Sequence, residues 1–274
     1  MIHRALCQVL AVLLFLAAGV TRAESRLELS VVTDWQTVTL FGSPEKTEQA
    51  IHSIVEHTAT IYKEQLGIEL VLTSTQVPQD PTQDDVPADT QPEFLLRSMQ
   101  EYRTNHPKHR AADVTALISS RNLHIGSKIY SGYANIGPVC SATSVALFSL
   151  QSTGVEAVTL AHEIAHTIGA SHDGEVPCEN ESSTGWIMAA SGTYGGDRFS
   201  ACSADVIKES IERFGDCISE PPVAASASGS TAPPVASASV SSDGGGGSWD
   251  ALSALALAGV LLFRRRRGAG VPQA

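Results

Sequence analysis

Three histidines and one glutamate lie close together between residues 161 and 173, in the order His-Glu-x-x-His-x-x-Gly-x-x-His-Asp. Neutral imidazole nitrogens are good ligands for Zn²⁺, so His162, His166 and His172 are candidate ligands of one zinc ion. Three protein ligands leave one coordination position open for water, which is typical of catalytic zinc. Glu163 directly follows the first ligand and is the candidate general base that takes a proton from that water.

The spacing of these residues also predicts the elements that position them. A helix over residues 154–168 places His162 and His166 one turn apart on the same face. Gly169 then allows the positive φ with which a chain often leaves a helix, and the turn can bring His172 round as a third ligand. A soluble helix with incidental histidines is the alternative. An ordinary core needs no such set of residues at this spacing, so the pattern favours the metal site.

The extended pattern resembles that of the metzincin metalloproteases, which also have a methionine-containing turn beneath the metal. Residues 185–190 (Gly-Trp-Ile-Met-Ala-Ala) match this Met-turn, and ordinary core packing of Met188 is the alternative. Asp173, directly after the third histidine, is typical of the adamalysin (reprolysin, ADAM-like, M12B-type) branch. Ala190 stands where the family often has a proline, which loosens the match but removes no ligand.

The resemblance continues along the chain as an ordered series of weaker matches and spans about residues 26–218. The matching segments are residues 27–34, 61–68, 132–140, 199–203 and 217–218. The resemblance implies the metzincin fold, an α/β fold with a twisted mixed sheet, a long active-site helix, a Met-turn and a C-terminal helix.

The resemblance also implies an activity. It points to a zinc metalloendopeptidase (EC 3.4.24 type) that hydrolyses a protein or peptide substrate, with Glu163 as general base. A binding module that keeps the fold with a structural zinc is the alternative. The complete set of three histidines and a glutamate favours the enzyme.

The hydrophobic pattern independently predicts strands that alternate with helices. The predicted strands are residues 27–33, 68–75, 114–119 and 144–150, and the predicted helices are residues 44–66, 93–105, 154–168 and 204–214. Residues 77–91 are rich in Pro, Asp, Gln and Thr and indicate a surface loop. Residues 128–139 are expected to be irregular. Such an alternation favours an α/β sheet covered by helices.

Four cysteines remain outside the apolar N-terminal segment, at positions 140, 178, 202 and 217. An even number in an exported chain indicates two disulfides, and the residues alone allow three pairings. The adamalysin resemblance implies the pairs Cys140–Cys217 and Cys178–Cys202.

The same resemblance implies a structural calcium ion as a second cofactor. Its ligands would be Glu28, Asp113 and the carbonyl region of Cys217, with Glu220 as a further candidate. The alternative is that these carboxylates are ordinary solvated surface groups.

The two ends of the chain differ in composition from the middle. Residues 1–23 have a basic start, an apolar run and a small-residue cleavage site, which predicts a secretory signal peptide rather than a retained anchor. Residues 24–219 are the predicted catalytic domain. Residues 220–243 are rich in Ala, Ser and Pro and predict a linker. Residues 244–267 contain glycines, an apolar run and four arginines, and residues 268–274 form a short tail.

The order of glycines, apolar residues and arginines in residues 244–267 resembles the GlyGly-CTERM sorting tail of Gram-negative bacteria. The resemblance implies transient insertion into the inner membrane, with the arginines on the cytoplasmic side, and cleavage by a rhomboid-type sorting protease (rhombosortase). A permanent anchor and a GPI signal are the alternatives, although a GPI signal ends with apolar residues. We therefore expect an exported protein, secreted or held at the cell surface of a Gram-negative bacterium.

The charge of the chain excludes one class of partner. The formal net charge is −11, and the segment from Glu24 to Asp243 contains 12 basic and 28 acidic residues. Such a segment repels phosphate groups, so we expect no nucleic acid as a partner. We expect the protein to be a monomer.

Overall fold

The computed structural model describes residues 25–150, 155–190, 196–214 and 217–218. The predicted signal peptide, linker and sorting tail (residues 1–23 and 220–274), and with them Glu220, lie outside the described residues. Within the described residues, no helix has the length and apolar character needed to cross a membrane.

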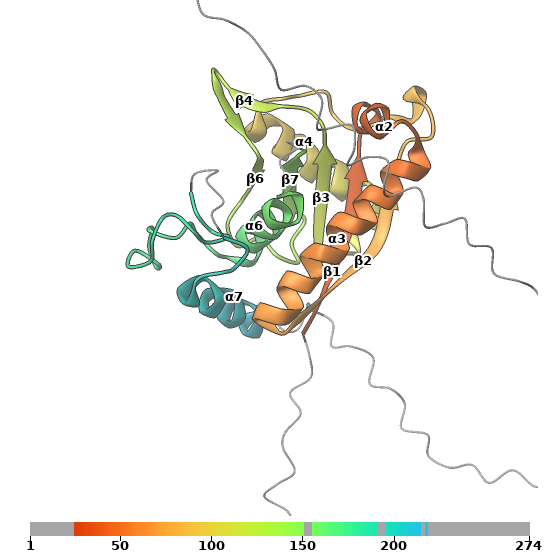
Figure 1. Cartoon of the computed structure of the whole chain (residues 1–274). Helices are drawn as coiled ribbons and strands as arrows, with labels where there is room; N and C mark the ends of the chain where they lie inside the picture. Colours follow the sequence, from red (N-terminus) through yellow and green to blue (C-terminus); the bar gives the residue numbers. More distant parts are fainter. Residues whose placement is uncertain (1–24, 151–154, 191–195, 215–216, 219–274) are drawn as a thin grey trace, which may run out of the picture. The chain divides into compact units, whose positions relative to one another are not determined.

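The centre of the fold is a five-stranded mixed sheet with the strand order β2-β1-β3-β7-β6 (Figure 1). Strands β1, β2, β3 and β7 run parallel, and β6 pairs with β7 in the antiparallel direction. The strands are β1 (Ser25–Thr33), β2 (Ile68–Gln76), β3 (Val114–Ser119), β6 (Gly132–Ala134) and β7 (Val145–Ser149). The expected mixed α/β fold is confirmed, and β6 forms one edge of this sheet.

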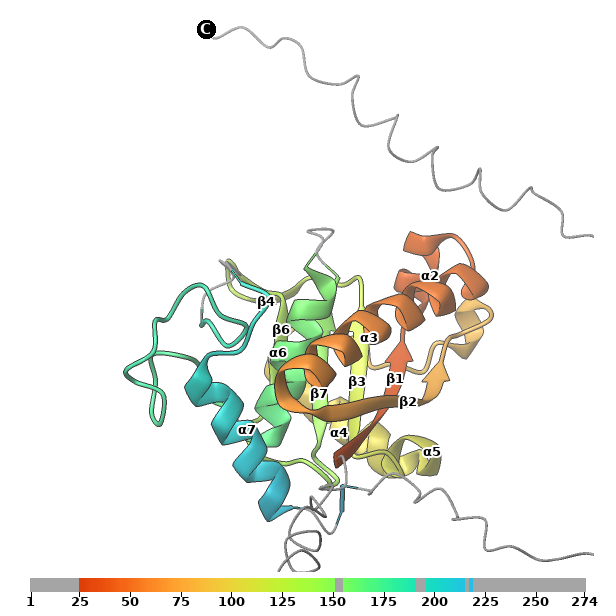
Figure 2. The ribbon, with the colours of Figure 1, turned by 60° about the horizontal axis from the view of Figure 1, so that its bottom comes forward.

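Helices cover both faces of the sheet, because side chains alternate between its two sides. Leu29, Val31 and Phe148 point to one side, where α3 (Pro44–Leu66), α6 (Glu156–Ile168) and α7 (Ala201–Arg213) pack in one hydrophobic cluster. Val32 and Leu147 point to the other side and pack against α4 (Pro92–Asn105). Figures 1 and 2 show α3 and α6 on the same side of the sheet.

Helix α3 supports α6 from behind. It begins at Pro44, after the capping residue Ser43, and ends at Gly67 with φ +70°. From the face of α3, the hydroxyl of Tyr62 donates to the carbonyl of Ala161 at 3.0 Å, and the hydroxyl of Thr58 donates to the carbonyl of Ala157 at 3.2 Å. These hydrogen bonds, together with the buried apolar contacts, hold α6 in place.

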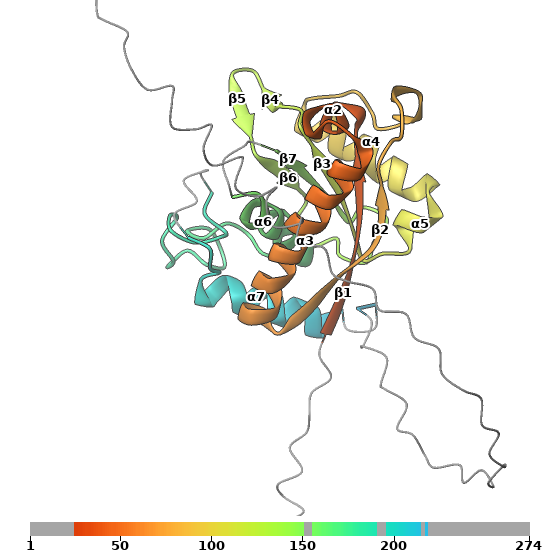
Figure 3. The same ribbon diagram turned by 45° about the vertical axis from the view of Figure 1, so that its right-hand side comes forward.

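Several short elements were not expected from the sequence. These are α2 (Trp35–Phe41), η1 (Pro81–Gln83), α5 (Pro107–Arg110), β4 (Leu123–Ile125) and β5 (Lys128–Tyr130). The expectation that residues 128–139 are irregular was wrong, since they contain β5 and β6. Both are three-residue strands without a completely buried face, so they leave no alternating hydrophobic pattern. Strands β4 and β5 form a two-stranded hairpin beside the main sheet (Figure 3).

Candidate metal centre

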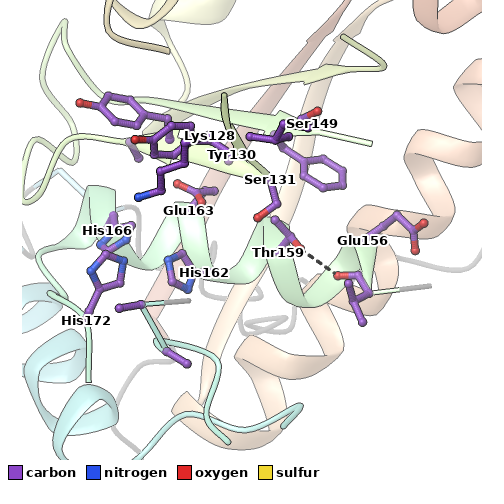
Figure 4. A pocket seen from close by; sticks show the side chains of 18 of the residues that line it. Lys128, Tyr130, Ser131, Ser149, Glu156, Thr159, His162, Glu163, His166 and His172 are labelled. Carbon is purple, nitrogen blue, oxygen red and sulfur yellow. Dashed lines mark hydrogen bonds between the residues drawn. The ribbon is translucent and has the colours of Figure 1, made fainter. Parts of the chain in front are cut away.

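The rings of the three candidate histidines lie side by side at one end of a cleft (Figure 4). Their ring centres are 4.6 Å (His162–His166), 5.3 Å (His162–His172) and 4.8 Å (His166–His172) apart. One nitrogen from each ring can be chosen so that all three lie within 4.8 Å of one another. This set of donor atoms fits one metal ion bound by three imidazoles.

Backbone carbonyl groups orient the two histidines of α6. The Nδ1 atom of His162 lies 2.6 Å from the carbonyl oxygen of Ile187, and that of His166 lies 2.7 Å from the carbonyl oxygen of Ala170. An Nδ1–H that donates to a carbonyl leaves Nε2 as the free donor atom for a metal. Burial lowers the pKa of His162 to about 3 and that of His166 to about 4. Both rings are therefore neutral near pH 7, as metal binding requires.

The third histidine comes from the loop after α6. Gly169 ends the helix with φ +128°, a value that an L-residue with a side chain rarely adopts. His172 then lies with its Nδ1 atom 3.6 Å from the Oε2 atom of Glu175. A turn brings these two residues together, since the Glu175 N–H donates to the His172 carbonyl at 3.1 Å and Gly174 has φ +88°. His172 thus has a carboxylate neighbour where the other two histidines have carbonyl partners.

Glu163 is enclosed between α6 and β6. Only 4 % of its surface is exposed, and its burial raises its pKa well above the ordinary value. Its Oε2 atom has no hydrogen-bond partner among the residues that the structure describes. A Cβ atom at Gly132 would lie 2.3 Å from the Oε1 atom of Glu163, so only glycine fits there. Glu163 is thus a buried carboxyl group in the wall of the cleft, with one oxygen that lacks a hydrogen-bond partner among the described residues.

Met188 directly follows Ile187, whose carbonyl group orients His162. Its side chain is fully buried, and its carbonyl accepts a hydrogen bond of 2.8 Å from the N–H of Asp173. The Oδ1 atom of Asp173 accepts hydrogen bonds from the hydroxyl groups of Ser200 (2.6 Å) and Ser203 (2.8 Å) at the start of α7. Asp173 therefore joins the histidine loop, the methionine turn and α7. No local pattern indicates these two serines, because their partner Asp173 lies 27 and 30 residues away.

The cleft above the histidines has a volume of about 720 Å³. Its walls come from the β4–β5 hairpin, β6, α6 and the residues after Met188. They include Lys128, Tyr130, Gly132, Phe148, Thr159 and Ala189 together with Glu163 and the three histidines. The size is that of a site for a small molecule or a short peptide segment.

Two disulfides flank this centre. The structure links Cys178 to Cys202 and Cys140 to Cys217, the two pairs that the resemblance implies. The first disulfide joins the histidine loop to α7. The second joins the segment after β6 to the chain beyond α7.

The expected calcium ligands lie near the second disulfide. The Oδ2 atom of Asp113 accepts a hydrogen bond of 2.8 Å from the N–H of Glu28, and the N–H of Cys140 donates to the carbonyl of Asp113. Burial raises the pKa of Asp113 to about 6. The Glu28 carboxylate forms an ion pair of 3.4 Å with Arg26. The structure therefore brings Glu28 and Asp113 together. The guanidinium group of Arg26 lies beside Glu28.

The chain is similar to known zinc metalloproteases over most of its length. The sequence profile of the reprolysin (M12B) family of zinc metalloproteases matches residues 26–222. The chain is 28% identical over 204 residues to human disintegrin and metalloproteinase domain-containing protein 23, covering 72% of this chain and 24% of that protein. It is 30% identical over 206 residues to human disintegrin and metalloproteinase domain-containing protein 11, covering 72% of this chain and 26% of that protein. The chain thus spans about a quarter of the length of these relatives.

A similarity among solved structures concerns the fold alone. A chain in a structure described as a chaperone–substrate complex superposes with a TM-score of 0.54 at 13% identity. The superposition covers 73% of this chain and 36% of the other.

Proposed function

Because the chain belongs to the reprolysin (M12B) family of zinc metalloproteases, we propose that it is a zinc-dependent endopeptidase that hydrolyses peptide bonds in proteins. One observation carries this proposal. Three imidazoles converge at one end of an open cleft, beside a buried carboxyl group with one oxygen that has no hydrogen-bond partner among the described residues. A purely structural metal site needs neither the cleft nor the carboxyl group.

In this proposal, His162, His166 and His172 hold the catalytic zinc. The imidazole rings of His162 and His166 on α6 are neutral and oriented by carbonyl groups, and they need no rearrangement to bind zinc. When bound, zinc lowers the pKa of a water molecule and polarises the carbonyl group of the substrate. Met188, Gly169 and Asp173 act by holding the histidines in position.

Glu163 moves the proton. Its Oε2 atom, which has no hydrogen-bond partner among the described residues, accepts a proton from the attacking water as the new carbon–oxygen bond forms. The buried carboxyl group carries that proton until the amine departs. Glu163 then donates the proton to the amine nitrogen, and the carboxylate is restored.

The edge strand β6 binds the substrate backbone. One edge of β6 pairs with β7, and β6 is the last strand in the order of the sheet. An extended peptide that pairs with the other edge extends the sheet and brings its carbonyl groups beside Glu163, which touches Gly132. This mode accepts a protein segment only when it is extended.

Replacement of Glu163 by Gln tests the assignment of the general base. The Glu163→Gln variant should bind zinc as the wild type does, because the amide has the same shape, and should lose activity by roughly 10²- to 10⁴-fold. Glu209→Gln, at an exposed position on α7, is the matched control and should retain full activity. Zinc content by elemental analysis and peptide cleavage by mass spectrometry measure both effects. Full activity in Glu163→Gln would exclude Glu163 as the base.

We also propose that the protein is exported. The two disulfides in the structure support a route through an oxidising compartment. In this proposal, residues 1–23 are the signal peptide, residues 24–219 the catalytic domain and residues 220–243 a linker. Residues 244–267 insert transiently into the inner membrane of a Gram-negative bacterium until a rhomboid-type protease removes them. Mass spectrometry of the mature protein tests this, since it should locate the C-terminus near residues 244–248.

A structural calcium ion completes the proposal. Asp113, Glu28 and the carbonyl group of Cys217 supply oxygen ligands, which calcium prefers. The hydrogen bond of 2.8 Å between the Glu28 N–H and Asp113 supports the proximity of the first two ligands.

A further inference from the structure

We propose that Lys128 gives the cleft a preference for peptides with an acidic side chain on the N-terminal side of the cleaved bond. This inference rests on the proposed peptidase function and adds the class of substrate.

Lys128 lies at the upper wall of the cleft. It is exposed at the start of β5, and it is one of the residues that line the cleft together with Glu163 and the histidines. Figure 4 shows its side chain pointing from the hairpin across the cleft, toward the part of α6 that carries Glu163 and His166. An ammonium group at this place meets any peptide that lies along that part of the cleft.

One aromatic ring contacts this lysine, and a second ring, on the edge strand, packs against the first. The Nζ atom of Lys128 lies 4.7 Å from the centre of the Tyr130 ring, which is a favourable distance for a cation–π contact. The Tyr130 ring in turn contacts Tyr133 of β6 edge to face, with ring centres 6.2 Å apart. The positive charge is therefore anchored next to the strand that would pair with the substrate.

Few other charges line the cleft. Apart from Glu163 and the histidines, the charged lining residues in the described part of the chain are Lys128 and Glu156. Residues 151–154 (Gln-Ser-Thr-Gly) and 191–195 (Ser-Gly-Thr-Tyr-Gly), which border the described wall in sequence, contain no charged residue. Glu175 adds a negative charge beside His172. Apart from the histidines and the proposed zinc ion, Lys128 is therefore the positively charged group of the described cleft wall that would attract an acidic side chain of a peptide.

The direction of the bound peptide follows from the direction of β6. Gly132 lies against Glu163, and the Gly137 N–H, just after β6, donates to the carbonyl of His166 at 2.9 Å. Strand β6 therefore runs in the same sense as α6. A peptide antiparallel to β6 begins at the His166 end of α6 and ends at the Glu156 end. Lys128, above the His166 end, thus faces residues that precede the cleaved bond (Figure 4).

The expected effect is moderate because Lys128 is exposed. An ion pair at an exposed site changes an equilibrium by roughly two- to fivefold, and salt weakens it. Reversal of the charge adds repulsion to the loss of attraction. We therefore expect the preference between acidic and basic peptides to change by about tenfold or more.

A charge reversal with matched peptides tests the inference. Two peptides, identical except for Glu or Lys at the second and third positions before a known cleavage site, are compared by the ratio of their kcat/KM values. The wild type should favour the acidic peptide, Lys128→Met should remove the preference, and Lys128→Glu should reverse it. Lys46→Glu, at an exposed position on α3 away from the cleft, makes the same change in net charge and should leave the ratio unchanged.

The outcomes separate this inference from the proposed function. If zinc-loaded wild type cleaves both peptides and Lys128→Glu leaves their ratio unchanged, the inference is wrong and the peptidase function stands. An equal shift in Lys46→Glu would also overturn it, because the effect would then belong to net charge. If the zinc-loaded wild type cleaves no peptide of a library, so that no cleavage site is found, the peptidase proposal fails. Fluorescence anisotropy with the same peptides then decides the inference, which predicts tighter binding of the acidic peptide and the reverse order for Lys128→Glu.

Discussion

At the scale of single residues, the position of Glu163 depends on the absence of a side chain on the opposite strand. Gly132 leaves the space that the glutamate fills, and a Cβ atom there would lie 2.3 Å from the glutamate Oε1 atom. Glu163 is only 4 % exposed, so its carboxyl group lies in the buried part of the fold. Gly132 is thus a positioning residue for the proposed base.

Replacement of Gly132 by Ala should therefore displace Glu163 while the sheet remains folded. A displacement of about 1 Å of a reacting group costs roughly 100-fold in rate, and we expect a loss of this size in kcat/KM. The substitution leaves the three histidine ligands unchanged, so zinc content should stay at the wild-type value. Circular dichroism checks that the fold is retained. A Gly132→Ala variant with unchanged kcat/KM would show that Glu163 does not require this space.

His109 gives the fold a sensitivity to acid. It is 2 % exposed, and its burial lowers its pKa to about 4, below the ordinary value of 6.5. The unfolded chain therefore binds a proton more readily than the folded protein between these two pH values. The stability that neutral His109 contributes is complete above pH 6.5 and is lost as the pH falls toward 4.

Replacement of His109 by Phe should remove this acid sensitivity. At pH 5 the wild type should have lost roughly 2 kcal/mol of unfolding free energy from this group, relative to pH 7. The variant should lose less over the same range. Urea unfolding at both pH values measures the two differences, and parallel losses in both proteins would contradict the assignment.

The sequence could predict the residues whose partners are close in the chain. The histidines, Glu163, Gly169 and Met188 all lie in motifs shorter than fifteen residues. Gly132, Ser200 and Ser203 could not be recognised, because each acts on a residue that is distant in sequence and the effect depends on tertiary packing. Glu175 lies only three residues after His172, but a carboxylate in a polar loop gives no sign that it faces a ring.

At the scale of elements, the metal centre has a rigid part and a looser part. Helix α6 carries two histidines and is held by α3 and the sheet. The third histidine lies on a loop, 30 % exposed, beside a carboxylate that is 58 % exposed. Two features constrain that loop, namely the hydrogen bond of 3.0 Å from the Gly174 N–H to the Cys178 carbonyl and the Cys178–Cys202 disulfide.

Removal of the Cys178–Cys202 disulfide should therefore weaken zinc binding through His172. In the double variant Cys178→Ser with Cys202→Ser, we expect the dissociation constant for zinc to rise by roughly tenfold, as when a neighbour of a ligand is lost. Competition with a coloured chelator measures it. Removal of Cys140–Cys217 is the comparison, and it should lower stability with little change in zinc affinity. Equal losses of affinity in both variants would contradict a specific role for the first disulfide.

The sequence predicted the long elements better than the short ones. Helix α3 has a cap, a proline at its start and a glycine at its end, and the four parallel strands are strongly hydrophobic. Strand β6 has only three half-buried residues, and β4 and β5 are equally short. Their pairing depends on neighbours that are distant in sequence, so local pattern could not reveal the edge of the cleft.

At the scale of the whole molecule, the two ends of the catalytic fold meet near Asp113. Glu28 lies on the first strand, and Cys217 follows the last helix and is bonded to Cys140. A calcium ion bound there would tie the start of the fold to its end. Burial raises the pKa of Asp113 to about 6, and a bound cation would favour its charged form.

Calcium should therefore raise the thermal stability of the protein. At 5 mM calcium, and with a dissociation constant of about 10⁻⁴ M, the expected gain is roughly 2 kcal/mol. The gain should disappear in Asp113→Asn, and magnesium at the same concentration should give less. Thermal unfolding with zinc present throughout measures these differences. If calcium does not change the melting temperature of the wild type, Asp113 and Glu28 do not form a calcium site.

The division of the metal ligands between a supported helix and a cross-linked loop also bears on how the metal enters. Little of the chain has to become ordered when zinc binds, because the imidazole rings of His162 and His166 on α6 are already in position. Amide hydrogen exchange should therefore slow mainly in residues 171–178 when zinc is added, and hardly at all in α6. In such a protein, metal uptake orders one loop and does not require a whole domain to fold.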